Sequence, residues 1–142
     1  MKKITCLLID DDADDRELFG MALGDMSENI EYISTENCHD AIRISRAGQP
    51  VIPDFIFLDL NMPYHDGKEC IRELKNTEHL EETPVIIYTT STFEKDIEDT
   101  RKLGAKHYFT KTPHFEELIK VLSSLFQKDS LPFLLNLEAK RY

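Results

Sequence analysis

The sequence predicts a doubly wound α/β fold, in which helices cover both faces of a parallel sheet. Two observations lead to this prediction. Five short apolar segments alternate along the chain with five segments of helical pattern. The segments at 55–58 and 85–88 are apolar or aromatic at every position, as is typical of strands buried on both faces. With 142 residues, the chain is expected to fold as one domain without disulfides or a structural metal.

The strand candidates are short and are rich in β-branched and aromatic residues. They are residues 4–9, 30–34, 55–58, 85–88 and 107–110. The second is the weakest, because polar residues interrupt it.

The helix candidates carry recognisable start and stop signals. Asp66 precedes the third helix as a capping acid, the segment from Ser91 to Glu94 forms a capping box for the fourth, and Pro113 suits the first position of the fifth. The candidates are residues 14–23, 38–47, 66–76, a segment that follows 91–94 and ends at 103–104, and a segment that starts at 113. The fifth has one continuous apolar stripe, which indicates a helix packed on the sheet.

The charge balance excludes several classes of partner. Seventeen Lys and Arg residues against twenty-seven Asp and Glu residues give a net charge of −10, which argues against binding to nucleic-acid phosphates or to an anionic membrane surface. The longest apolar runs are far shorter than a membrane span. Residues 10–12, all Asp, interrupt any signal-peptide core. We therefore expect a cytoplasmic protein without nucleic-acid or membrane partners.

The cysteines agree with a reducing compartment. Cys6, Cys38 and Cys70 are odd in number, widely spaced and free of any Cys-x-x-Cys pair. Cys6 and Cys70 lie among apolar residues, so we expect both to be small core side chains.

The polar residues that carry chemistry follow the predicted strands. Asp10 and Asp11 follow the first, Asp59 the third, Thr89 ends the fourth and Lys111 follows the fifth. Ligands of open α/β sheets bind at the carboxyl ends of the strands, so we expect these five side chains to gather in one pocket. Three carboxylates attract a hard divalent cation, and oxygen ligands favour Mg²⁺. A carboxylate beside such a cation can attack phosphorus and form an acyl phosphate.

Four motifs together resemble the response-regulator receiver domain of two-component signalling, of the stand-alone, chemotaxis-regulator-like kind. The motifs are Leu7-Leu8-Ile9-Asp10-Asp11-Asp12, then Asp59-Leu60-Asn61-Met62-Pro63 with Asp66-Gly67, then Pro84-Val85-Ile86-Ile87-Tyr88-Thr89, then Gly104-Ala105 with Lys111. The resemblance covers about residues 3–128. It implies a flavodoxin-like (βα)5 sandwich of strand order 2-1-3-4-5. The receiver domain is expected over residues 1–128, with an apolar tail over 129–142 and no separate effector domain.

By this resemblance Asp59 is the phospho-acceptor, and its donor is a phosphohistidine on a sensor histidine kinase or a histidine phosphotransfer protein. Mg²⁺ would be bound by Asp11 directly, by Asp10 directly or through water, by Asp59, and by the backbone carbonyl of Asn61.

The resemblance also assigns the switch. Thr89 would be the switch hydroxyl and Lys111 the phosphate partner, and the ring of Tyr108 would move between exposed and inward rotamers. The chain would then be a signalling switch rather than an enzyme, with its output passed to an unknown protein. Receivers commonly use the face formed by the fourth helix, fifth strand and fifth helix, so a homodimer through this face or through the tail is also expected.

The chain departs from the family at one position and leaves several alternatives open. Lys111 is followed by Thr112 before Pro113, whereas the family has Lys-Pro with a cis bond. A cis bond before a non-proline residue costs ~2.5–4 kcal/mol, so this loop is either trans or strained. The apolar tail at 130–137 either folds back on its own domain or packs on a second subunit or partner.

Two rival functions fit part of the pattern. One is a Mg²⁺-dependent phosphohydrolase with an aspartyl nucleophile, although such enzymes usually carry that residue on the first strand. The other is a binding module that keeps the fold and is never phosphorylated, for which the altered loop after Lys111 is the best support.

Overall fold

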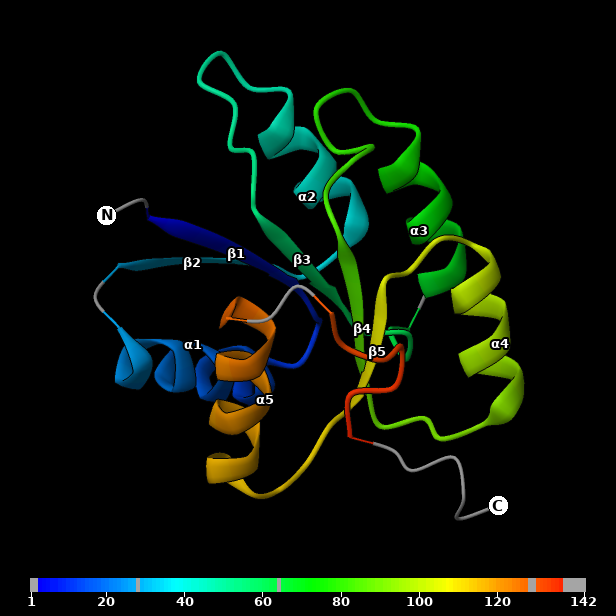
Figure 1. Ribbon diagram of the computed structural model, residues 1–142. Helices are drawn as coiled ribbons and strands as arrows, with labels where there is room; N and C mark the ends of the chain where they lie inside the picture. Colours follow the sequence, from blue (N-terminus) through cyan, green and yellow to red (C-terminus); the bar gives the residue numbers. More distant parts are fainter. Residues whose placement is uncertain (1–2, 28, 64, 128–129, 137–142) are drawn as a thin grey trace.

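A parallel five-stranded sheet forms the centre of the computed structural model (Figure 1), which describes residues 3–27, 29–63, 65–127 and 130–136. The strand order is β2-β1-β3-β4-β5, and every neighbouring pair is parallel. The strands are β1 (Ile4–Ile9), β2 (Ile30–Thr35), β3 (Phe55–Leu58), β4 (Val85–Thr89) and β5 (His107–Thr110). The predicted fold class and strand order are therefore confirmed.

Helices cover both faces of this sheet (Figure 1). They are α1 (Ala13–Met26), α2 (Cys38–Ser45), α3 (Gly67–Lys75), α4 (Glu94–Lys102) and α5 (Phe115–Gln127). Alternate residues of a strand face opposite sides. Leu7 and Ile9 of β1 accordingly join the core under α2, α3 and α4, whereas Cys6 and Leu8 join the core under α1 and α5. Burial on both faces explains why the central strands are apolar throughout.

The predicted helix starts are right at α3 and wrong at two other helices. Asp66 caps α3 by accepting hydrogen bonds from the amides of Lys68 and Glu69. The capping box predicted at Ser91 does not form, because the Ser91 hydroxyl accepts from the Phe93 amide rather than from Glu94 and donates to the Asp96 carboxylate. Helix α4 begins at Glu94 without a side-chain cap, and α5 begins at Phe115 rather than at residue 113.

The prediction that Cys70 is an unpaired core side chain is wrong. Cys38 and Cys70 form a disulfide between the start of α2 and the middle of α3, with their Cα atoms 5.9 Å apart. The sequence did not indicate this pair because 32 positions separate the two residues, and only the packing of α2 beside α3 brings them together. Cys6 is a buried free thiol, as predicted.

The segment 130–136 folds back on its own domain and runs beside β5 (Figure 1). The Tyr108 amide donates to the Phe133 carbonyl at 2.8 Å, and the Leu135 amide donates to the Tyr108 carbonyl at 3.0 Å. The Asn136 side chain pairs with both the amide and the carbonyl of Thr110, at 2.9 and 2.8 Å. Of the two alternatives for the tail, this part adopts the intramolecular one. Residues 129 and 137–142 lie outside the described residues.

Candidate functional site

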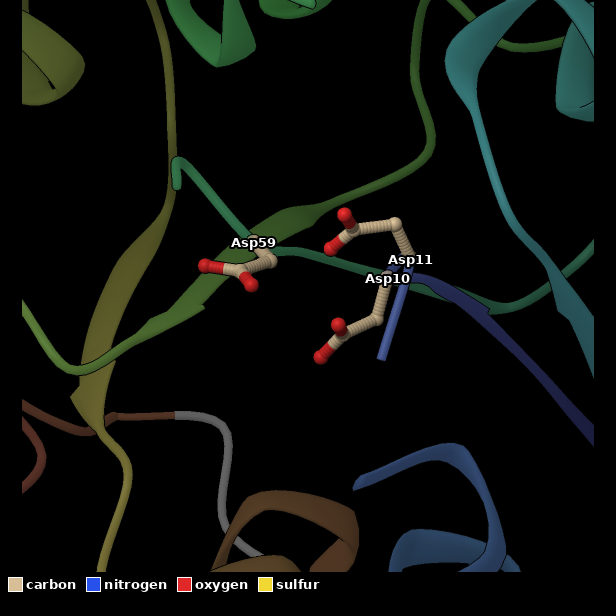
Figure 2. A group of neighbouring side chains, drawn as sticks. All are labelled: Asp10, Asp11 and Asp59. Carbon is tan, nitrogen blue, oxygen red and sulfur yellow. The ribbon is translucent and has the colours of Figure 1, made fainter. Parts of the chain in front are cut away.

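Three carboxylates meet at the carboxyl edge of the sheet (Figure 2). Asp10 follows β1 and Asp59 follows β3, and these strands are neighbours, so the Asp59 amide donates to the Ile9 carbonyl at 3.0 Å. Asp10 and Asp59 are buried, whereas Asp11 is exposed at the rim of the pocket. One oxygen from each of the three carboxylates lies within 4.8 Å of the others. The topology thus brings together residues that the sequence separates by about fifty positions.

Lys111 enters the same pocket from the end of β5. Its Nζ lies 2.9 Å from Asp10, 2.7 Å from Asp15 and 3.1 Å from Asp59. The Lys111 amide donates to the Thr89 carbonyl, which ties the loop to β4. No peptide bond among the described residues is cis, so the bond from Lys111 to Thr112 is trans. Lys111 therefore reaches the carboxylates without the cis bond that the resemblance implies at this position.

Asp15 is a further member of this pocket and is not among the predicted site residues. It lies in the first turn of α1, and its carboxylate reaches Lys111 Nζ at the end of β5, a pairing that no spacing in the sequence indicates. Asp12, by contrast, is the N-cap of α1 and accepts a hydrogen bond from the Asp15 amide at 3.0 Å.

The buried acids and Lys111 perturb one another. Burial raises the pKa of Asp10 to about 6, although the Lys111 ammonium and the Asp12 amide act in the opposite direction. Burial alone would lower the pKa of Lys111, but the carboxylates of Asp15, Asp10 and Asp59 outweigh it and raise that pKa above its usual range. Lys111 is therefore a permanent cation that offsets part of the negative charge in the pocket.

The carboxylates fit a divalent cation. The Asp10 Oδ2 atom is buried and makes no hydrogen bond with the residues that the structure describes, although it forms an ion pair with Lys111 Nζ at 2.9 Å. A buried carboxylate oxygen with unused acceptor capacity beside two further carboxylates favours a hard cation. Asp10, Asp11 and Asp59 could hold such an ion, and the expected fourth protein ligand, the carbonyl of Asn61, lies two residues after Asp59.

Asn61 bridges the acidic pocket and the end of β4. Its amide donates to Asp59 Oδ1 at 3.1 Å, and its side-chain Nδ2 donates to Thr89 Oγ1 at 3.1 Å. Thr89 Oγ1 also accepts from the Ser91 amide at 3.3 Å. A hydroxyl accepts two hydrogen bonds and donates one. With both acceptor positions occupied, the Thr89 hydroxyl proton is left to be donated within the pocket.

Tyr108 lies in the inward rotamer. Its ring is fully buried and its hydroxyl donates to the Ser91 carbonyl at 2.9 Å. Burial raises the pKa of Tyr108 to about 12, so this hydroxyl remains a donor. The Phe133 ring of the folded-back segment lies 6.3 Å from the Tyr108 ring, and the Arg101 guanidinium lies 5.1 Å above the Phe133 ring. The segment 130–136 thus covers the residue that the resemblance assigns to the switch.

No helix among the residues that the structure describes is long and apolar enough to cross a membrane. The fold and the pocket together define a receiver-type α/β module, with an acidic site at the carboxyl edge of its sheet.

Comparison with known proteins places the chain in a family. Residues 6–123 match the response regulator receiver domain family, and the chain belongs to it. Response regulator Rcp1 of Synechocystis is 36% identical over 73 residues, which cover 51% of this chain and 50% of Rcp1. The polar-differentiation response regulator DivK of Brucella anthropi is 32% identical over 112 residues, covering 75% of this chain and 89% of DivK. The segments aligned in sequence cover about half the length of Rcp1 and of two other curated relatives, at 50%, 56% and 52%.

Solved structures give the same assignment. The Mn²⁺-bound form of Rcp1 superposes with a TM-score of 0.78 at 28% identity, covering 91% of this chain and 99% of that chain. The phosphorylated cyanobacterial phytochrome response regulator RcpA gives a TM-score of 0.78 at 27% identity, covering 92% and 99%. The chain is therefore a response regulator receiver domain, and its predicted family is confirmed.

Proposed function

We propose that this chain acts as a single-domain response regulator that accepts a phosphoryl group on Asp59. The observation that carries the proposal is the gathering of Asp10, Asp11, Asp59 and Lys111 in one pocket, with Thr89 linked to it through Asn61. A phosphorylated form is known for RcpA, which shares the fold at 27% identity.

The reaction transfers the phosphoryl group from a phosphohistidine to the Asp59 carboxylate. One Asp59 oxygen forms the new bond to phosphorus as the phosphorus–nitrogen bond of the donor breaks, and the leaving imidazole takes up a proton. Lys111 offsets the charge of the transferred group, and the Thr89 hydroxyl donates a hydrogen bond to one of its oxygens. A bound Mg²⁺ would neutralise further charge on the phosphoryl oxygens.

The phosphoryl group then acts as a switch by shifting a conformational equilibrium. It favours the state in which Thr89 and Lys111 reach it, and Tyr108 follows through its contact with Ser91. The proposed chemistry is that of a signalling switch, without multiple turnover of a small-molecule substrate.

The proposed donor is a sensor histidine kinase or a histidine phosphotransfer protein, and the proposed compartment is the cytoplasm, which the family supports and the Cys38–Cys70 disulfide opposes. Output passes through protein contact at the face formed by α4, β5 and α5, where the segment 130–136 already covers β5 and forms part of the surface offered to a partner. Phe93 supports this choice, because it is 74% exposed at the start of α4. A homodimer could use this face or the tail. Comparing the molecular mass in solution of the full chain with that of a chain ending at Gln127 tests the contribution of the tail.

Acetyl phosphate with Mg²⁺ tests the acceptor. We expect the intact mass to rise by one phosphoryl group, and we expect the gain to disappear in Asp59→Asn. The matched control is Asp66→Asn, which alters a nearby acid that caps α3 outside the pocket. A wild-type chain that gains no phosphate supports the inert binding module, and rapid turnover of a small phosphomonoester supports the phosphohydrolase.

A further inference from the structure

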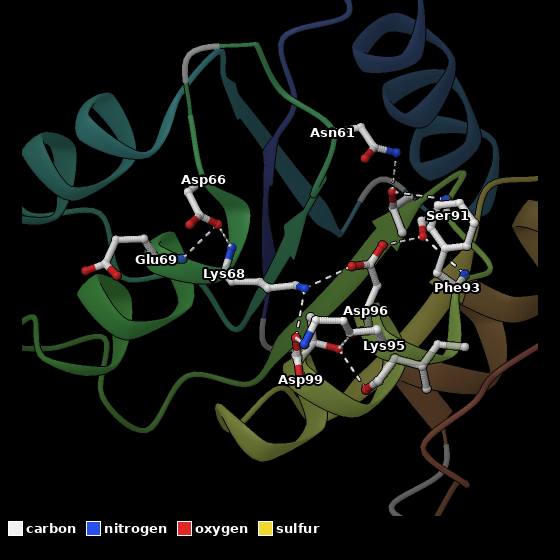
Figure 3. A network of polar contacts seen from close by, with 12 residues as sticks. Asn61, Asp66, Lys68, Glu69, Ser91, Phe93, Lys95, Asp96 and Asp99 are labelled. Carbon is white, nitrogen blue, oxygen red and sulfur yellow. Dashed lines mark hydrogen bonds and ion pairs between the residues drawn. The ribbon is translucent and has the colours of Figure 1, made fainter.

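Lys68, in the first turn of α3, reaches across to the neighbouring helix α4 (Figure 3). Its Nζ lies 2.9 Å from Asp96 Oδ1 and 3.0 Å from Asp99 Oδ2. Lys95 also contacts Asp99, at 3.2 Å, but forms no ion pair with Asp96 in the described part of the chain. Lys68 is therefore the cation that joins Asp96 to α3.

Asp96 also contacts Ser91, which lies in the segment between β4 and α4, so it links Lys68 to that segment. The Ser91 hydroxyl donates to Asp96 Oδ2 at 2.5 Å (Figure 3). The Ser91 amide donates to Thr89 Oγ1, and the Ser91 carbonyl accepts from the Tyr108 hydroxyl. All three polar groups of Ser91 are therefore engaged, two of them by the residues assigned to the switch.

Helix α4 is fixed weakly by apolar packing, since Ile97 and the adjoining Leu103 are only partly buried against the core. Thr100 is its one buried residue among those described, and no side chain caps its first turn. The side chains of Lys68, Asp96 and Asp99 are 26%, 22% and 30% exposed, so water screens their ion pairs less than it screens a fully exposed pair. Hydrogen bonds to Asp96 and Asp99 raise the pKa of Lys68. Burial would raise the pKa of Asp96, but the bonds from Ser91 and Lys68 lower it.

We propose that Lys68 is a positioning residue for the switch segment: by holding Asp96, it keeps Ser91 where Ser91 orients Thr89 toward Asn61 and accepts from an inward Tyr108. Asn61 also contacts Asp59, so this arrangement links the Thr89 hydroxyl to the acceptor carboxylate through one residue. The inference rests on the proposed function, in which Asp59 carries the phosphoryl group. Removing Lys68 leaves Asp96 and Asp99 with one exposed cation between them, and α4 then draws Ser91 away from the site.

Binding of beryllofluoride in the presence of Mg²⁺, followed by calorimetry, tests the proposal without a phosphoryl donor. We expect Lys68→Met to weaken binding about fivefold to tenfold, the size of one lost hydrogen bond of ordinary net strength, because the ion pair is partly exposed. Lys95→Met is the matched control, because it removes a cation from Asp99 and leaves Asp96 untouched; we expect its affinity within about twofold of wild type. Lys68→Arg restores most of the affinity, since an arginine fork can span the two carboxylates.

The outcomes separate this proposal from the one on which it rests. If the wild-type chain neither binds beryllofluoride nor gains phosphate on Asp59, the proposed function fails. If the wild type binds and Lys68→Met equals Lys95→Met, only the positioning role is overturned. If Lys68→Met does not fold, Ser91→Ala cuts the same link one step later, and an unchanged affinity there also overturns the role.

Amide exchange gives a second readout that needs no ligand. In the free chain, the peptide spanning residues 89–97 should exchange faster in Lys68→Met than in Lys95→Met at equal overall stability. Equal exchange in the two variants contradicts the proposal.

Discussion

Helices α3 and α4 are neighbours on one face of the sheet and have nine residues each, yet they are held in different ways. Helix α3 buries Gly67, Cys70, Ile71 and Leu74, has a side-chain cap, and is joined to α2 by the Cys38–Cys70 disulfide. Helix α4 buries Thr100 alone among its described residues and has no such cap.

The difference in how the two helices are held matches the roles proposed for the segments before them: one carries the acceptor, and the other carries the switch residues. Helix α3 follows the acceptor loop, and Gly67 at its start permits close packing, because a Cβ there would lie 2.8 Å from the Leu60 Cα. Helix α4 follows the switch segment. Apolar burial is lost when a helix moves, whereas polar groups can exchange partners with water or with a phosphoryl group. A fixed acceptor beside a displaceable helix is what a phosphorylation switch needs.

The largest expected contrast comes from truncating one apolar side chain on each helix. Leu74 is fully buried, so Leu74→Ala should lower the free energy of unfolding by about 2–5 kcal/mol. Ile97 is partly buried against the same core, so Ile97→Ala should cost roughly 1 kcal/mol. Urea unfolding of the two variants measures both values. Equal losses would mean that α4 depends on its apolar face as much as α3 does.

The Cys38–Cys70 disulfide should stabilise the α3 side by somewhat less than the Leu74 side chain does. It closes a loop with a sequence separation of 32, which corresponds to about 2–4 kcal/mol in the free energy of unfolding. Unfolding with and without a thiol reductant measures this contribution. The Cys38→Ala/Cys70→Ala variant is the control and should not respond to the reductant. A wild-type chain that is equally stable in both conditions would show that α3 is held by its packing alone.

Most of the fold could be predicted from the sequence because its signals are local. The strands at 4–9, 55–58 and 107–110 have the predicted bounds, and the other two extend one residue further. A continuous apolar run reports burial on both faces wherever the strand ends up. The grouping of Asp10, Asp59 and Lys111 also followed, because the carboxyl ends of parallel strands share one edge.

The features that escaped prediction are pairings between distant residues. The Cys38–Cys70 disulfide, the contact of Asp15 with Lys111 and the bonds from Lys68 to Asp96 depend on how neighbouring helices face one another. No period in the sequence encodes those distances. The sequence left two alternatives for the tail for the same reason: its apolar residues predict burial but do not indicate the surface against which they pack.

The smallest expected effect is a pH dependence of stability that should be present for the ion pair of α4 and absent for the apolar packing of α3. The Lys68 bond contributes to lowering the pKa of Asp96 in the folded chain. A carboxylate whose folded pKa is depressed stabilises the native state above its unfolded pKa of about 4, and this stability is lost as the pH falls through the folded value. At pH 7, Lys68→Met should therefore be less stable than wild type by up to about 1 kcal/mol, the range of partly exposed ion pairs. At pH 3 the difference should shrink, because Asp96 begins to protonate in the wild type.

The loss of stability from Leu74→Ala should persist at both pH values, since no titrating group contributes to it. Urea unfolding at pH 7 and pH 3 measures both differences. A Lys68→Met loss that stays constant would mean that the lysine stem contributes by packing, and that charge does not distinguish the way α4 is held from the way α3 is held.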